Sequence, residues 1–244
     1  MRIASKWIKH RVLAENPSLR KHLPETQLYT NHSLWQMIAR HRTVFLKPVV
    51  GTGGKGIIRI VRRNGACFSV QIGMNKYSVK SKQRLLRLIR YLTGLKQYLV
   101  QQGIDLISLE KRPLDYRLLI LRPGSAWKII GIMGKWAARG KIVTNHCRGG
   151  KPIDFQPSLK RSLGLSKRKC KKMENNIHAL GRRVAETLGN HYRMRGLGLD
   201  IGIDKQKRIW LLEANTEPLY RLFRYHHNRA LYPKIVRYMK QIGR

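Results

Sequence analysis

The sequence predicts an α+β protein built mainly from antiparallel strands, with helices between them. Short apolar or alternating segments are separated by turn-forming residues, among them Asn64-Gly65 and Pro123-Gly124. Two longer segments, residues 81–97 and 167–189, carry apolar side chains every three or four positions, as amphipathic helices do. No internal repeat or low-complexity linker divides the 244 residues, so we expect one or two subdomains with a full core.

The first half of the chain is expected to alternate strands and helices around a glycine-rich loop. Residues 1 to about 30 are basic, and we expect them to be irregular because Pro17 and Pro24 interrupt any long helix. Residues 31–41 read as a short helix capped by Asn31 or Ser33. The remaining elements are a strand at 43–50, the loop at 51–56, strands at 57–63 and 66–73, a helix at 81–97 and a strand at 98–104.

The second half is expected to contain two antiparallel hairpins separated by a long helix. Strands at 116–123 and 127–137 meet at Pro123-Gly124, and a polar loop at 138–152 follows them. After the helix at 167–189, a second hairpin covers residues 198–218. Residues 219–244 are basic and are expected to be helical.

The second hairpin holds a third of the chain's scarce carboxylates. Of 12 acidic residues, four fall here: Asp200, Asp204, Glu213 and Glu217. If Gln206 and Lys207 form a two-residue loop, Asp200 lies across from Glu213, and Asn215 shares the face of Glu213. Two carboxylates and an amide oxygen form a ligand set that Mg²⁺ accepts. We therefore predict a metal site here; a solvated hairpin with chance acidic residues is the alternative.

The glycine-rich loop contains the pattern G-x-G-x-x-G in Gly51, Gly53, Gly54, Lys55 and Gly56. A dinucleotide-binding fold needs a helix directly after this pattern, but the β-branched residues that follow indicate a strand. We therefore expect a flap between two strands, whose backbone N–H groups close over phosphates. An ordinary flexible hairpin turn is the alternative.

Three basic side chains are candidates for binding anions. Lys47 ends the strand before the loop and could bridge nucleotide phosphates, although a solvated lysine is the alternative. Arg117 shares a strand face with Asp115, which suits either a structural ion pair or an arginine aimed at a phosphoryl group. Arg148, followed by Gly149 and Gly150, could form a second anion clamp.

The formal net charge of +39 indicates affinity for polyanions such as nucleic acid, anionic lipid or wall polymer. The basic residues occur in every segment, and no zinc-finger, RNA-recognition or basic-zipper signature accompanies them. No apolar run is long enough for a membrane span, and no signal peptide is recognisable. Three scattered cysteines fit a reducing cytoplasm, where we expect the protein.

Taken in order, these motifs resemble those of the ATP-grasp superfamily, and more narrowly of its endospore-coat-associated YheC/YheD group. The resemblance covers roughly residues 24–240 and rests on FLKPVVGTGGKGIIRI, YLVQQGIDL, LDYRLLI and GLDIGID…WLLEANTEP. It implies two α+β subdomains, at about 43–103 and about 104–240, that clamp a nucleotide. Residues 1–23 then form a basic N-terminal segment.

The resemblance also implies roles for individual residues. Lys47 and the flap would contact phosphates, and Arg117 and Arg148 would lie near the γ-phosphate. The hinge residues Gln101, Gln102 and Ile104 would face adenine, with Asp105 at the ribose. The metal ligands, for Mg²⁺ or Mn²⁺, would be Asp200, Glu213 and Asn215.

We consider three functions on this basis. The first is an ATP-dependent carboxylate–amine ligase that acts through an acyl-phosphate, with both substrates unknown. The second is a nucleotide-binding or structural spore-coat protein that does not ligate, and the third is a polyanion-binding module. Only about 25 residues precede LPETQLYT, where the family usually has another domain. The acceptor site would then be incomplete, supplied by a partner or lost, and the charge suggests an anionic acceptor or an anionic spore or wall surface.

Overall fold

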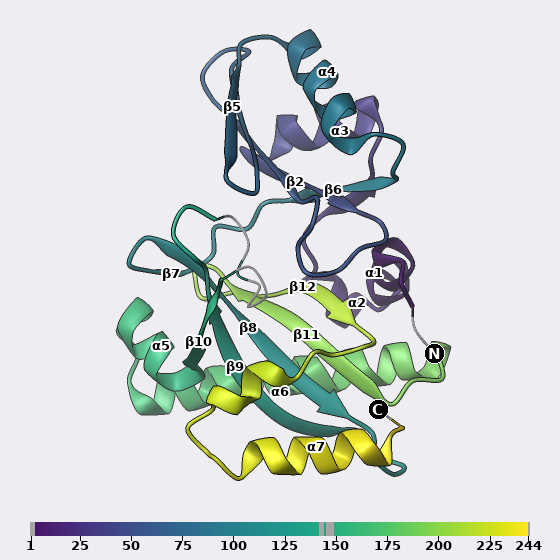
Figure 1. Ribbon diagram of the computed structural model, residues 1–244, viewed down its shortest axis with the longest axis vertical. Coiled ribbons are helices and arrows are strands. Elements are labelled where there is room, and N and C mark those ends of the chain that lie inside the picture. Colours follow the sequence, from purple (N-terminus) through teal and green to yellow (C-terminus); the bar gives the residue numbers. More distant parts are fainter. Residues whose placement is uncertain (1–2, 142–143, 145–148, 244) are drawn as a thin grey trace.

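The computed structural model describes residues 3–141, 144 and 149–243, which form two antiparallel sheets with helices packed against them (Figure 1). The first sheet has the strand order β1-β6-β2-β3-β4-β5. Its strands are β1 (Thr26–Leu28), β2 (Thr43–Pro48), β3 (Ile58–Arg62), β4 (Phe68–Ile72), β5 (Asn75–Val79) and β6 (Tyr98–Gln102). Helices α3 (Asn31–Arg40) and α4 (Lys82–Thr93) share a hydrophobic core with this sheet.

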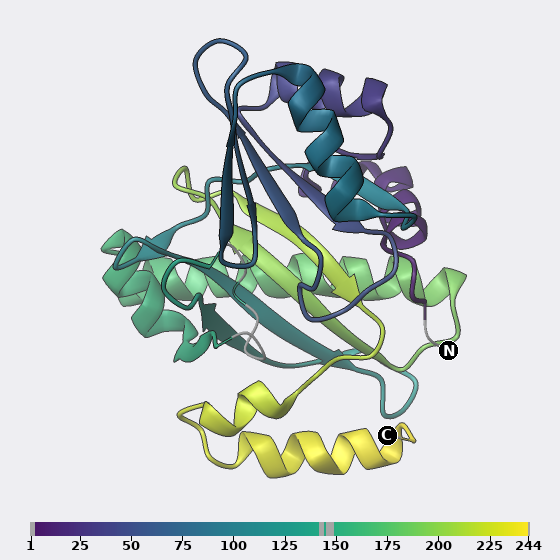
Figure 2. The same cartoon turned by 45° about the horizontal axis from the view of Figure 1, so that its top comes forward.

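The second sheet has the order β10-β9-β8-β11-β12, and a short strand, β7, also pairs with β8. Its strands are β7 (Ser108–Leu109), β8 (Arg112–Leu121), β9 (Lys128–Trp136), β10 (Lys151–Asp154), β11 (Gly196–Ile203) and β12 (Ile209–Asn215). Helices α5 (Phe155–Leu163) and α6 (Lys167–His191) share a core with one face of it. The 3₁₀ helix η2 (Arg221–Tyr225) and α7 (Leu231–Gln241) pack on the opposite face (Figure 2).

The prediction of an irregular N-terminus was wrong. Residues before Thr26 form α1 (Lys6–Glu15) and α2 (Pro17–Arg20) beside the junction of the two sheets (Figure 1). Pro17 does end the first helix, but it also begins the second, where its missing N–H costs nothing. Leu13 and Leu19 are buried in the core of the second sheet. Tertiary burial of these two leucines stabilises a segment whose sequence has almost no amphipathic pattern.

Most other predicted elements are present with shifted ends. The residues after the glycine-rich loop form β3, paired antiparallel with β2, so the loop joins two strands as predicted. The cap of α3 is Thr30 rather than Asn31 or Ser33, with Ser33 as its reciprocal partner in a capping box. The sequence interpretation missed the short strands β1, β5, β7 and β10 and the nine-residue helix α5. None of the described helices combines the length and apolar composition that a bilayer-spanning segment needs.

The β11–β12 hairpin has the predicted pairing of Asp200 with Glu213, although its turn differs from the predicted two-residue loop. Asp200 pairs with Glu213, and Gly198 pairs with Asn215. The turn is longer than predicted, because Ile203 pairs with Ile209 and Lys207 adopts a positive φ of 66°. A bulge then shifts the register by one residue after Asp200, so Leu212 is the extra residue of β12. The longer turn and the bulge cancel, which leaves the predicted pair opposite each other.

Candidate functional site

The alternation of β11 creates a polar site on one face of the second sheet. Leu197, Leu199, Ile201 and Ile203 point into the core that contains α6. With a period of two, the opposite face carries Gly196, Gly198, Asp200 and Gly202. The glycines have no side chain, so groups from neighbouring strands lie directly over this strand. Asp200 is therefore surrounded by long side chains of β8 and β9.

A buried ion-pair network joins β8, β9 and β11. Lys135 Nζ lies 2.7 Å from Asp200 Oδ1 and 3.0 Å from Asp115 Oδ1. Arg117 Nη2 lies 3.1 Å from Asp200 Oδ1. Thr144 donates a hydrogen bond from Oγ1 to the other oxygen of Asp115. All five side chains are buried, so each charge depends on its neighbours for the stabilisation that water would provide.

The two aspartates in this network have opposite pKa shifts. Burial by itself raises the pKa of Asp200, but the charges of Arg117 and Lys135 outweigh burial and hold this pKa below its ordinary value. For Asp115, burial dominates over the charge of Lys135, and the nearby Asp200 adds to the increase, so its pKa lies above its ordinary value. Asp200 is thus the fixed negative charge at the centre of the site.

Arg117 is held tightly but incompletely satisfied. Its Nη1 is buried and, within the described part of the chain, has no hydrogen-bond partner. It lies over Gly198, where a Cβ would come within 2.3 Å of Nη1. A buried guanidinium N–H without a partner is costly, and such groups are rare in folded proteins. An acceptor such as a phosphate oxygen would remove that cost.

Glu213 and Asn215 lie next to this network on β12. The amide Nδ2 of Asn215 is 3.5 Å from Asp200 Oδ2. The Glu213 carboxylate is 3.7 Å from Lys6 Nζ of α1. The structure therefore brings the three predicted metal ligands onto one surface. Asp200 already contacts two cations, whereas Glu213 has a single, longer ion pair among the described residues.

Lys6 also links the N-terminal helix to the glycine-rich loop. Its Nζ donates a hydrogen bond of 2.6 Å to the carbonyl of Gly51, and its backbone N–H donates to the Val49 carbonyl at 2.9 Å. Beside it, Ile3 N–H donates to Thr216 Oγ1 just past β12. The N-terminal segment therefore spans from the loop to the strand that carries Glu213.

Lys47 approaches the same space from the first sheet. Its side chain is half-buried, and its ammonium donates to the neutral Gln101 side chain of β6. Burial lowers the pKa of Lys47, and the charges of Glu213, Asp200 and Asp115 act in the other direction. Gln101 is itself fixed by donating to Thr26 Oγ1 at 2.9 Å. Lys47 is thus a half-buried cation that shares its surroundings with the carboxylates of the second sheet.

The glycine-rich loop needs its glycines for conformational reasons. Gly53, Gly54 and Gly56 have φ values of 64°, 71° and 76°, in the left-handed region that other residues avoid. Gly56 is also crowded, since a Cβ there would lie 3.0 Å from the Tyr98 hydroxyl. Lys55 lies within the loop, and its side chain is exposed. These positions explain the glycine pattern through backbone geometry, independently of any ligand.

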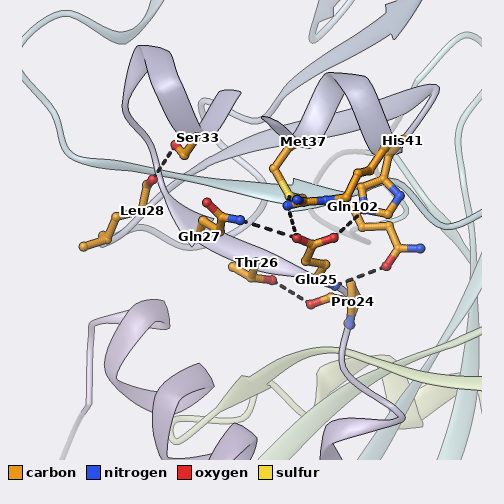
Figure 3. A network of polar contacts seen from close by, with 10 residues as sticks. Pro24, Glu25, Thr26, Gln27, Leu28, Ser33, Met37, His41 and Gln102 are labelled. Carbon is orange, nitrogen blue, oxygen red and sulfur yellow. Dashed lines mark hydrogen bonds and ion pairs between the residues drawn. The ribbon is translucent and has the colours of Figure 1, made fainter. Parts of the chain in front are cut away.

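The predicted hinge residues point in different directions. Gln101 faces Lys47, whereas Gln102, next along β6, faces the opposite side and accepts a hydrogen bond from the Glu25 N–H at 3.1 Å (Figure 3). Ile104 is half-buried, and the exposed Asp105 pairs with Lys205 at 2.9 Å. Gln102 therefore helps to fix Glu25, whose carboxylate also binds His41.

Sequence reasoning missed Lys6 and Lys135 as site residues. Lys135 carried a usable signal, because it is a lysine inside an otherwise apolar stretch of β9, whose other lysine, Lys128, lies at the strand end. Lys6 carried none, because it lies in a segment where basic residues are common. Arg148, predicted as an anion clamp, lies outside the described residues.

The cavity between the two sheets is small. It has a volume of about 40 Å³, roughly that of one water molecule. The first sheet contributes Lys47, Leu99 and Gln101, β12 contributes residues 211–214, and α1 contributes Lys6 and three neighbours. Lys6, Lys47 and Glu213 line this cavity, and the charges of Asp200 and Asp115, which belong to the ion-pair network with Arg117 and Lys135, also act on Lys47. Such a region can hold a polyanion together with a cation.

Comparison with known proteins identifies similar chains. A family model described as YheC/D like ATP-grasp matches residues 1–242. Two proteins of Bacillus subtilis (strain 168) are similar. Endospore coat-associated protein YheD is 23% identical, and the match covers 93% of this chain and 51% of YheD. Endospore coat-associated protein YheC is 22% identical, and the match covers 88% of this chain and 60% of YheC. The VanG D-Ala:D-Ser ligase of Enterococcus faecalis superposes with a TM-score of 0.57 at 13% identity, covering 98% of this chain and 60% of that one. The chain thus spans about half to three-fifths of the relatives it matches.

Proposed function

Because the chain belongs to the YheC/D-like ATP-grasp family, we propose that it binds ATP with Mg²⁺ or Mn²⁺ between its two sheets. The observation that carries this proposal is Arg117 Nη1, which is buried without a hydrogen-bond partner among the described residues. The charges of Arg117 and Lys47 both act on Asp200, and a triphosphate supplies acceptors for both groups. Lys6, at the glycine-rich loop, adds a third cation.

In this proposal, the metal binds to Glu213 and Asn215, with Asp200 beside them. The donors fit Mg²⁺, which prefers carboxylate and amide oxygens and keeps several waters or phosphate oxygens. Asp200 contacts Lys135 and Arg117, so coordination by Asp200 means sharing its carboxylate with these cations. When bound, the metal neutralises phosphate charge.

We propose ATP-dependent carboxylate–amine ligation as the reaction. The acceptor carboxylate attacks the γ-phosphorus, the bond to the β-phosphate breaks, and an acyl-phosphate and ADP form. An amine then attacks the acyl carbon and expels inorganic phosphate. Arg117, and Arg148 with it, would stabilise the negative charge on the transferring phosphoryl group. The protein contributes positioning and charge, because the ATP and the substrates supply the bonds that change.

The remaining predicted residues complete the nucleotide site in this proposal. Lys47 and the backbone of Gly51, Gly53, Gly54, Lys55 and Gly56 bind phosphates. Gln101, Gln102 and Ile104 form the hinge segment against adenine, although the Gln101 and Gln102 side chains point to opposite sides, and Asp105 reaches the ribose. For Asp105 this means leaving its ion pair with Lys205, which is exposed and therefore weak.

The test is Mg²⁺-dependent ATP affinity, measured by calorimetry on wild type and on a Glu213→Gln, Asn215→Ala double variant. We expect the double variant to lose at least about tenfold in affinity in the presence of Mg²⁺, about 1.4 kcal/mol. Glu186→Gln, at an exposed helical position of the same charge, serves as the control. Equal affinity of the double variant and wild type contradicts the metal assignment. ADP release with carboxylate and amine panels then separates a ligase from a protein that only binds nucleotide or has a structural function in the spore coat.

A second function, binding of an anionic polymer, has support from α6. Lys167, Arg168, Lys171 and Lys172 are exposed and form one stripe along the first half of this helix. Such a stripe attracts a phosphate-rich chain, and each neutralised phosphate adds to the salt dependence of binding. We expect the affinity for a DNA oligonucleotide or a wall polymer to fall steeply between 50 and 200 mM salt (about 10³-fold or more if six phosphates are contacted). An affinity that does not respond to salt contradicts this second function.

A further inference from the structure

We propose that Asp154, His226 and His227 form a binding site for a first-row transition-metal ion, of which Zn²⁺ is the representative. One ligand atom from each of the three residues lies within 4.8 Å of the others. Asp154 ends β10, and the two histidines directly follow η2. None of the three belongs to the nucleotide site proposed above, so this site is independent of that proposal.

The local backbone explains why these side chains meet. Asp154 occupies the cap position of α5, but its carboxylate makes no capping hydrogen bond with that helix. It accepts hydrogen bonds from the backbone N–H of His227 at 3.3 Å and from His227 Nδ1 at 3.0 Å. The His226 and His227 rings stack with centroids 4.2 Å apart. The end of η2 is therefore fixed against the end of β10 by the carboxylate.

The distances suit a metal ion in place of a proton. Tetrahedral Zn²⁺ with bonds of about 2.0–2.1 Å places its ligand atoms roughly 3.4 Å apart. The 3.0 Å between His227 Nδ1 and Asp154 Oδ1 needs only a small increase when the ion replaces the shared proton. His226 Nδ1 accepts the Asn228 N–H at 3.1 Å, so a metal ion that binds this lone pair displaces that hydrogen bond. Asn228 is exposed, so water can take over that hydrogen bond.

The donor types select the metal class. Two imidazoles and one carboxylate favour Zn²⁺, Ni²⁺ or Cu²⁺ over Mg²⁺, which prefers oxygen. The His227 side chain is 71% exposed, which leaves room for water at the remaining positions. The negative charge of Glu174 on α6 also acts on His226 and partly offsets the basic surroundings.

A bound ion would connect the second sheet to the C-terminal helix. Asp154 belongs to β10, whereas His226 and His227 lie in the connection between η2 and α7. The present link consists of hydrogen bonds to one carboxylate at a solvent-exposed position. Coordination replaces these bonds with stronger ones, so metal binding should stabilise the folded chain.

The test uses the full, untagged chain, freed of metal with EDTA and dialysed. Zn²⁺ is titrated by calorimetry and Co²⁺ by visible absorption, both without ATP. We expect one equivalent to bind and the melting temperature to rise with Zn²⁺. His227→Gln and Asp154→Asn should each weaken Zn²⁺ binding at least tenfold, while His191→Ala, which changes another exposed histidine, should not.

Two results would overturn the proposal: no binding of Zn²⁺ or Co²⁺ by wild type, or equal binding by wild type, His227→Gln and Asp154→Asn. Circular dichroism without metal checks that the variants fold; because the replaced His227 side chain is exposed, His227→Gln keeps the test decisive if Asp154→Asn unfolds. The Glu213→Gln, Asn215→Ala double variant should keep full Zn²⁺ binding. The zinc result does not depend on whether this variant loses Mg²⁺-dependent ATP affinity, so each proposal can fail without the other.

Discussion

Arg117 lies directly over Gly198, so closely that a Cβ at position 198 would come within 2.3 Å of Arg117 Nη1. The glycine allows the guanidinium to cross β11 and to contact Asp200 at 3.1 Å. Gly198 therefore determines the position of the arginine that we place at the γ-phosphate. This dependence makes a residue without a side chain part of the site.

Gly198→Ala should displace Arg117 and break its contact with Asp200. We expect a loss of stability of about 1–3 kcal/mol from overpacking, together with weaker ATP binding. Denaturant unfolding and calorimetry measure the two effects. Gly124→Ala is the control, because a Cβ at position 124 meets nothing within 4 Å. If Gly198→Ala matches wild type in both measurements, Arg117 does not depend on this glycine.

Lys135→Met should leave the carboxylates of Asp115 and Asp200 buried near each other without their shared cation. Breaking a buried ion pair typically costs about 3–5 kcal/mol, and we expect a loss in this range from urea unfolding at pH 7. The double variant Lys135→Met, Asp115→Asn should recover part of the loss, because one of the two facing charges is gone. If the double variant instead loses the sum of the two single-variant losses in unfolding free energy, Asp115 and Asp200 do not repel each other as proposed.

The single variant Lys135→Met should also differ from wild type in how its stability depends on pH. Without Lys135, the pKa values of Asp115 and Asp200 rise in the folded state. A carboxyl whose folded pKa exceeds its unfolded value binds protons preferentially when folded, so stability increases as the pH falls toward the unfolded value of 3.8. Relative to wild type, Lys135→Met should therefore regain stability between pH 7 and pH 5. A constant difference across this range would count against the prediction.

Lys47→Met should weaken ATP binding without destabilising the free protein. The side chain is half-buried, and burial lowers the pKa of its ammonium, so the folded chain bears part of the cost of desolvating this charge. A methionine of similar length removes that cost. We expect ATP affinity to fall about tenfold or more, about 1.4 kcal/mol, and the melting temperature of the free protein to stay level or rise. A lower melting temperature with unchanged ATP affinity would show that Lys47 is purely structural.

Asp204→Asn should reduce stability at neutral pH only. Burial raises the pKa of Asp204, but hydrogen bonds from Trp210 and Arg208 outweigh burial and lower it overall. A lowered folded pKa gives stability that is complete above 3.8 and is lost as the pH falls through the folded value. Charged hydrogen bonds contribute about 1.5–3 kcal/mol. Urea unfolding should show a difference of this size at pH 7 that shrinks below pH 4, and a difference that persists at pH 2 would argue against it.

Much of the second sheet's polar surface followed from local sequence patterns. Alternation along β8 and β12 places Asp115 with Arg117 and Glu213 with Asn215, because side chains two residues apart share a strand face. The facing of Asp200 and Glu213 was also predicted, although the assumed two-residue loop was wrong. The bulge at Leu212 compensated for the longer turn, and neither feature follows from side-chain alternation or from the turn residues.

Short elements were the part of the fold that local patterns missed. Helices α1 and α2 form because Leu13 and Leu19 are buried against the second sheet, not because their own sequences favour an amphipathic helix. Strands of two to five residues, such as β7 and β10, have too few positions to show a period. The side-chain period within such a short strand also does not indicate which other strand it pairs with.

By itself, the sequence determined the order of strands and helices, the glycine-rich loop between two strands, and the carboxylates that share a hairpin face. These features depend on residues close together in the chain, so side-chain period and turn chemistry suffice to predict them. Only the tertiary structure decided that Lys135 joins Asp115 to Asp200, and that Lys6 reaches Gly51 and Glu213. The physical reason is that a buried charge must be neutralised by whichever group the fold brings within contact distance, however distant it is in sequence.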